Sequence, residues 1–277
     1  MLLRHLRRNA TLISIAAAIA LGSVDLLAQG DSEMARKAAS QIVVKIQRAD
    51  YEGDRAALNR LDGELLPFLD QPAIRARIRY WRGFAKWRRA INGANESPTP
   101  TDLVQDLADG EAEFAAALEL DPNFVDAKVG AASCAILRLF FEGTFTHTTD
   151  TATLRAVMEP PGRLLKEAQQ MASDNPRLLW VIGQNQWSIG SQDAALETYE
   201  RGLKSARAQR TKTDDPLEPS WGEPELLMNF AWSNLHRAKP DPEAAERYAR
   251  AALGLVPEWH YVRDILLPQI QDAKVRP

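Results

Sequence analysis

The stretch that most constrains the fold runs from Pro176 to Leu203, with the sequence PRLLWVIGQNQWSIGSQDAALETYERGL. Apolar or small residues recur every three to four positions on both sides of Gly190. This period is that of an amphipathic helix, and a glycine between two such segments marks a turn. The stretch therefore predicts a hairpin of two helices, in which Gly183 and Ala195 are small enough to allow close approach.

The same period recurs along most of the chain. Apolar stripes separated by turn residues predict further helix pairs over about 32–66, 72–122, 124–175 and 224–257, and a last helix over 259–273. The polar stretches 95–101, 143–151 and 209–222 are predicted as loops. No strand-like alternation of useful length interrupts these stripes, so the predicted class is all-α.

The hairpin also resembles a known repeat. Ile182 and Gly183 match the Leu-Gly of the tetratricopeptide (TPR) pattern W-x2-L-G-x2-Y…A-x3-F, and Ala195 and Tyr199 match its Ala-x3-Phe. The resemblance covers about residues 72–257. It implies a right-handed α-solenoid of about five TPR-like helix pairs with a C-terminal capping helix. It also implies a concave groove, lined by the first helix of each pair, in which peptides bind.

Composition limits the classes of function. Among the 277 residues, 45% are hydrophobic and 26% are charged, which is ordinary for a folded protein, and the net charge of −3 does not indicate a nucleic-acid partner. Cys134 is the single cysteine, so the chain has neither an internal disulfide nor a cysteine-based metal site. We expect no cofactor and no metal.

The N-terminus has the pattern of an export signal. Arg4, Arg7 and Arg8 precede an apolar run over 11–21, and small and polar residues follow near position 28. We therefore predict a signal peptide over 1–28, a single helical-repeat domain over 31–277 without a membrane span, and a location in the bacterial periplasm or outside the cell. The alternative is that the segment stays uncleaved as an N-terminal anchor.

Catalytic motifs are missing from the sequence. It has no G-x-S-x-G, no H-E-x-x-H and no glycine-rich phosphate loop, and its four histidines are scattered. His260, between Trp259 and Tyr261, is interpreted as a partly buried packing residue rather than a ligand. Cys134, among alanines, is interpreted as an inert core residue rather than a nucleophile. The sequence does not predict an enzyme.

The most informative surface feature is a stripe of cations over residues 75–89, RARIRYWRGFAKWRR. Arg75, Arg79, Arg82, Lys86 and Arg89 fall on one helical face. Equivalent positions in the two later pairs extend the predicted groove. The predicted groove-binding residues are Arg79, Arg82, Lys86, Arg89, Arg177, Trp180, Gln184, Trp187 and Trp232. The alternative is that the cations solvate a helix face and pair with Glu111 or Glu113.

These residues lead to two functional hypotheses. The first is an exported protein–protein interaction module or scaffold whose groove holds a protein segment, either acidic or ending in a C-terminal carboxylate. The second is a small-ligand or glycan-binding component of an envelope transport or assembly system. The seven tryptophans could stack on sugar rings, although their spacing favours packing in the core for most of them.

Overall fold

The structure is a computed structural model that describes residues 32–210 and 215–275. Within these ranges every regular element is helical and no strand is present. The predicted all-α class is therefore confirmed. In chain order the helices span 32–52, Arg55–Glu64 (α2), Leu66–Asp70 (η1), Arg75–Gly93 (α3), Leu103–Leu120 (α4), Val125–Phe141 (α5), Thr144–His147 (α6), Thr151–Met171 (α7), Pro176–Ser188 (α8), Gln192–Arg210 (α9), Glu223–His236 (α10), Pro242–Leu255 (α11), Tyr261–Leu266 (η2) and Leu267–Val275 (α12).

Several helices begin where the sequence supplies a capping side chain. At the start of α2, the Asp54 carboxylate accepts a hydrogen bond from the Ala57 backbone N–H at 2.8 Å. At the start of α8, Asn175 accepts from the Arg177 backbone N–H at 2.9 Å, and Pro176 fills a first-turn position that needs no donor. Such caps satisfy backbone donors that a helix leaves unpaired. They fix where the predicted helices start.

The segment between α5 and α8 is more helical than the sequence predicted. The stripe over 164–171 indicated a helix there, whereas α7 already begins at Thr151. The side chain of Asp150 caps it by accepting from the backbone N–H groups of Ala152 and Thr153. The predicted loop over 143–151 also contains the single turn α6.

The hairpin of α8 and α9 is as tight as predicted. A Cβ added at Gly183 would lie 2.2 Å from Cε1 of Tyr199, so only glycine fits there. Ala195 is fully buried. Gly190, with φ of 84°, provides the left-handed turn between the two helices.

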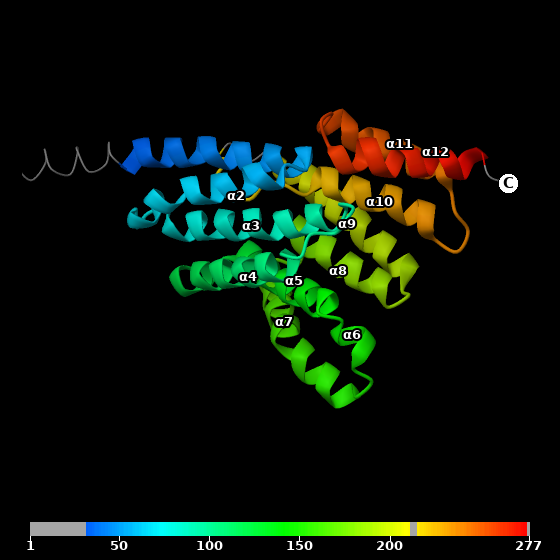
Figure 1. Ribbon diagram of the computed structural model, residues 1–277, viewed down its shortest axis with the longest axis horizontal. Coiled ribbons are helices and arrows are strands. Elements are labelled where there is room, and N and C mark those ends of the chain that lie inside the picture. Colours follow the sequence, from blue (N-terminus) through cyan, green and yellow to red (C-terminus); the bar gives the residue numbers. More distant parts are fainter. Residues whose placement is uncertain (1–31, 211–214, 276–277) are drawn as a thin grey trace, which may run out of the picture.

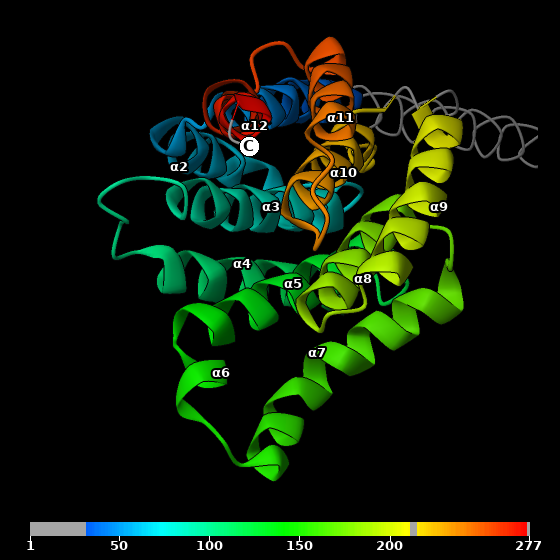
Figure 2. The same cartoon turned by 90° about the vertical axis from the view of Figure 1, so that its right-hand side faces the viewer.

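Helices that are neighbours in the sequence are mostly neighbours in space. α3 packs against α4, α4 against α5, α8 against α9, and α10 against α11 (Figure 1). In the second view, α3 lies between α2 and α4, while α7 lies along the lower side (Figure 2). Sequential packing of this kind is what the repeated helical stripes predicted.

The two ends of the described chain also meet. Figure 1 shows the helix 32–52 in blue on the same edge as α11 and α12 in orange and red. The Tyr51 hydroxyl donates to Oε1 of Glu225 on α10 at 2.7 Å, and its ring lies edge-on to Trp259 with 5.1 Å between centroids. Beside this contact, Arg88 and Asp50 form a buried ion pair at 2.8 Å. In an open solenoid each repeat contacts only its neighbours, so these contacts are an addition to that pattern.

The predicted signal peptide, residues 1–28, lies outside the described residues. Among the helices that are described, none combines the length and the apolar character needed to cross a bilayer.

Candidate functional site

The candidate site is built on α3, whose two faces carry different side chains. Tyr80, Trp81, Phe84 and Trp87 occupy one face and are all buried. The predicted cations occupy the opposite face, as their 3.6-residue period requires. Arg75 donates to the Leu69 carbonyl of η1, and the partners of the other four cations lie on α2, on α4 or at the residue that precedes α4. α3 thus separates an aromatic interior from a charged layer.

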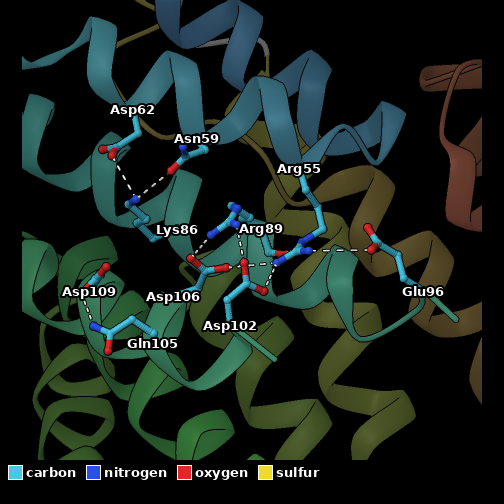
Figure 3. A network of polar contacts seen from close by, with 10 residues as sticks. All are labelled: Arg55, Asn59, Asp62, Lys86, Arg89, Glu96, Asp102, Gln105, Asp106 and Asp109. Carbon is cyan, nitrogen blue, oxygen red and sulfur yellow. Dashed lines mark hydrogen bonds and ion pairs between the residues drawn. The ribbon is translucent and has the colours of Figure 1, made fainter. Parts of the chain in front are cut away.

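The cations of the stripe are held by carboxylates from the two flanking helices. Glu113 on α4 accepts from Nη1 of Arg79 and from Nε of Arg82, both at 2.9 Å. Asp62 on α2 lies 3.3 Å from Nη2 of Arg82 and 3.3 Å from Nζ of Lys86. The contact between Lys86 and Asp62 is drawn in Figure 3. The pairing with Glu113 agrees with the alternative interpretation of the stripe, in which these cations are paired along a helix face.

The last cation of the stripe belongs to a denser network. Arg89 and Arg55 both contact Asp102 and Asp106 at the start of α4 (Figure 3). Burial raises the pKa of Asp106 even though Arg89 lies beside it. At Asp102 the effect of desolvation is outweighed by the hydrogen bond from Arg55 and the charge of Arg89, so the pKa of this carboxyl is lowered. The network fastens α4 to α2 and α3.

Between α2, α3 and α4 the charged layer is hollowed into an open pocket of about 290 Å³. Its charged lining residues are Asp62, Arg79, Arg82, Lys86, Asp109 and Glu113. Three cations therefore face three carboxylates around one small space. Such a lining suits a small polar ligand better than an apolar one.

The structure buries Arg82, which is 9% exposed beside the charged pocket, and it places two more of the predicted groove residues in the interior. Arg177 is 1% exposed and Trp180 is 3% exposed. Nε of Arg177 donates to Oδ1 of Asp126 at 2.7 Å, while Trp180 packs edge-on against Trp87 with 5.8 Å between centroids. Neither side chain is available on the surface in this conformation, because other parts of the chain cover them.

Three other predicted residues do reach the surface. Gln184 is exposed, and Trp187 and Trp232 are partly exposed. The two indoles meet edge-on across α8 and α10, with 5.5 Å between centroids, and the His236 ring stacks on Trp232 at 4.3 Å. Both tryptophans were predicted to face the same groove from different helix pairs, and the structure brings the two side chains together.

What covers Trp180 and Arg177 is a segment that sequence analysis treated as a surface loop. Residues 215–222, called here the inner segment, form no regular element, as predicted, but Leu217 and Trp221 are 0% and 5% exposed. Nε1 of Trp81 donates to the Leu217 carbonyl at 2.9 Å, and Nε1 of Trp221 donates to the Tyr80 hydroxyl at 2.9 Å. Large apolar residues in an otherwise polar stretch were the available signal for this burial.

The inner segment is held from both α3 and α8. The Trp221 ring packs against Phe84, Trp87 and Trp180, with centroid distances of 5.6, 5.8 and 5.8 Å. From α8, Nη1 of Arg177 donates to the Trp221 carbonyl at 3.1 Å. The segment therefore lies between these two helices.

Further contacts of the inner segment are ionic. Arg77 on α3 donates through Nε to Oε1 of Glu218 at 2.9 Å. Its guanidinium also lies over the Phe124 ring, 4.1 Å from the centroid. Arg77, which was not among the predicted site residues, thus helps to anchor this segment.

The residues considered for chemistry are poorly placed for it. Burial raises the pKa of the Cys134 thiol well above its ordinary value, so the thiolate that a nucleophile needs is disfavoured. The His260 side chain is 50% exposed and lies against Gly53, in agreement with a partly buried packing residue, and its Nδ1 lies 2.8 Å from Oδ2 of Asp264 on the same helix. Trp259, the residue before it, is buried. Over the described ranges, no group of three or more potential ligands could hold a metal ion.

Comparison with known proteins gives no family for this chain. No family model matches the sequence, and no curated protein is significantly similar to it.

Proposed function

We propose that this chain is a helical-repeat interaction module that binds an extended protein segment. The observation that carries the proposal is the way in which α3 and α8 hold the inner segment. Two side chains, Trp81 and Arg177, donate to main-chain carbonyls of a stretch without regular secondary structure, and an aromatic cluster receives its Trp221 side chain. Hydrogen bonds to the main chain combined with a side-chain pocket are the usual means of peptide recognition.

A partner would dock beside the inner segment, because that segment already fills the space between α3 and α8. On α8 and on the neighbouring α10, three side chains reach solvent, those of Gln184, Trp187 and Trp232. Partly exposed tryptophans are enriched among the residues that dominate binding energy at protein interfaces. We therefore assign the docking surface to the paired indoles of α8 and α10.

The cations of α3 have a smaller part in this proposal. Arg79 and Arg82 are bound to Glu113, and Arg89 is bound to Asp102 and Asp106. An acidic partner would have to displace these carboxylates before gaining the cations. Partner binding at the two tryptophans is accordingly expected to depend only weakly on salt.

Several finer expectations belong to the same proposal. They are a right-handed α-solenoid of about five TPR-like pairs, a capping role for α12, a non-catalytic role, and export guided by residues 1–28. The sequential packing of the helices supports the first. The basic and apolar pattern at the N-terminus supports the last.

The test is to probe the purified chain on a peptide array and on a glycan array, using the wild type, Trp187→Ala and Trp232→Ala. Peptide binding should fall at least about tenfold in both variants, as for other tryptophan hot spots. Phe140→Ala, which removes an aromatic side chain that is 61% exposed on α5, is the matched control and should bind like the wild type. Binding to glycans alone would favour the small-ligand or glycan alternative. Peptide binding that survives both tryptophan variants would place the docking surface elsewhere.

A further inference from the structure

The charged pocket between α2, α3 and α4 has an electrically balanced lining. Arg79, Arg82 and Lys86 come from α3, and an equal number of carboxylates comes from Asp62 on α2 and from α4. A simple anion could bind the cations only by taking them from their present carboxylate partners. A simple cation could bind the carboxylates only by taking them from the same side chains. A ligand that carries both charges could bind without disturbing this balance.

Two buried groups in the lining have unused hydrogen-bonding capacity. Arg82 and Asp62 are 9% and 6% exposed, yet Nη1 of Arg82 and Oδ1 of Asp62 have no hydrogen-bond partner. Oδ1 lies within ion-pair distance of Nη2 of the same arginine, at 3.3 Å. A buried charged group without its full set of hydrogen bonds is unfavourable and is rarely left so. Two neighbouring residues of the lining thus each keep one buried polar atom without a hydrogen bond, a donor on Arg82 and an acceptor on Asp62.

The ionisation of Asp62 supports this description. Burial raises the pKa of its carboxyl, although the charges of Arg82 and Lys86 act in the opposite direction. The two cations thus do not fully offset the loss of water around this carboxylate. An additional positive group beside Asp62 would offset the rest of this lost hydration.

The size and arrangement of the pocket restrict the ligand further. A volume of about 290 Å³ is at the lower end of the range for small-molecule sites and is too small for a folded segment. In an α-amino acid, the ammonium and carboxylate groups are joined through one carbon, which suits the adjacent positions of Asp62 and Arg82. In a longer dipolar ligand the two charged groups lie farther apart, so only one of them could reach Asp62 or Arg82.

We propose that this pocket binds a small zwitterion of the α-amino-acid type. The carboxylate lies toward Arg82 and Arg79, and the ammonium group lies toward Asp62 and Asp109. This site is separate from the tryptophan surface of the proposed function, and neither depends on the other.

The experiment is a calorimetric titration of the full chain with each proteinogenic amino acid at millimolar concentration. The amino acid that binds best is then compared with its N-acetyl derivative, which lacks the ammonium charge, and with its amide, which lacks the carboxylate. Each derivative should bind at least about tenfold more weakly, since each loses one charge-assisted set of hydrogen bonds. Binding of the free amino acid should also lower the pKa of Asp62.

Variants locate the site. Arg82→Gln and the rim variant Arg79→Gln should each weaken binding about tenfold or more. Arg60→Gln on α2 is the matched control, because Arg60 forms an exposed pair with Glu64 away from the pocket and should bind like the wild type. Thermal unfolding of each variant shows whether it is folded, and Arg79→Gln, at a one-third exposed position, keeps the test valid if Arg82→Gln does not fold.

Four outcomes would overturn the proposal. One is the absence of binding by every amino acid tested. Equal binding of the N-acetyl derivative would show an anion site, and equal binding of the amide would show a cation site. Binding unchanged in folded Arg79→Gln and Arg82→Gln would place the ligand outside this pocket.

Discussion

The two faces of α3 are built on the same helix but connected to different parts of the chain. The aromatic face contacts the inner segment, whose Leu217 and Trp221 are more than a hundred residues away in sequence. The charged face contacts carboxylates such as Asp62 and Glu113, within about thirty residues of their partners. On the aromatic face the distant contacts are made mainly by buried rings, with the Arg77–Glu218 pair beside them, whereas the ion pairs of the charged face join helices that are close in sequence.

The two faces of α3 also differ in how much they contribute to the free energy of folding. Burial of large aromatic side chains contributes several kcal/mol each. Ion pairs that are partly exposed contribute little, because their attraction is nearly offset by lost hydration and side-chain entropy. We therefore expect the aromatic face to determine stability and the charged face to determine the shape and polarity of the pocket.

The largest expected effect is that of Trp221→Ala. The substitution removes the ring that joins Phe84, Trp87 and Trp180 and leaves a cavity between α3 and α8. It should reduce the free energy of unfolding by about 3–5 kcal/mol, measured by urea denaturation. Trp187→Ala, the same change at a partly exposed indole, is the control and should cost less. Equal losses would mean that the inner segment is not part of the core.

Tyr80→Phe tests the polar side of the same contact. It removes the hydroxyl that accepts from Nε1 of Trp221 at 2.9 Å and leaves a buried donor without a partner. The expected loss in the free energy of unfolding is about 1–3 kcal/mol, again from urea denaturation. A variant as stable as the wild type would show that this hydrogen bond contributes nothing.

Arg79→Ala changes the adjacent residue, which lies on the opposite face. The Arg79 side chain is 32% exposed, and Glu113 keeps its bond to Arg82 in the variant. The expected loss is below about 1 kcal/mol and should shrink further in high salt. If Arg79→Ala proved more damaging than Tyr80→Phe, the proposed division of roles between the two faces would be wrong.

The smallest effect distinguishes two carboxyls of the charged layer. Burial raises the pKa of Asp62 above 3.8, whereas the hydrogen bond from Arg55 and the charge of Arg89 outweigh desolvation and lower the pKa of Asp102 below 3.8. The stability that Asp62 contributes therefore falls as pH rises through the window just above 3.8. For Asp102, it falls as pH drops through the window below 3.8. Carbon-detected NMR titration of the two side chains should give midpoints on opposite sides of this value, and a reversed order would contradict the described contacts.

Local structure could be predicted from the sequence because the signals for it are local. Apolar stripes of helical period, caps such as Asp54 and Asn175, and the small residues Gly183 and Ala195 each act over a few positions. The stripes, with the turn residues between them, predicted most of the helices, and the small residues predicted the tight hairpin; the caps become evident in the structure. The start of α7 was missed because its first turns are mostly exposed and carry no apolar stripe.

The arrangement of the candidate site depended on contacts between distant residues. The spacing of the cations put them on one face, but it could not show that Asp102 and Asp106 would meet Arg89. The burial of Arg177 and Trp180 follows from the position of the inner segment, and no periodic pattern connects that segment to α3 or α8. Trp187 and Trp232 were predicted on one surface because both fall on the groove-facing side of the first helix of their pairs.

The contact between the first described helix and the C-terminal helices has a consequence for how the protein folds. Tyr51 and Glu225, joined by a hydrogen bond, are 174 residues apart in sequence. A linear array can lose its terminal repeats one at a time, since each depends only on its neighbour. Here, fraying of the first helix would also expose Trp259 and α10, so unfolding from either end is coupled to the other end. We expect one cooperative transition rather than stepwise melting. We also expect slow folding for a helical protein, because the entropy of closing so long a loop is lost before the stabilising contacts form.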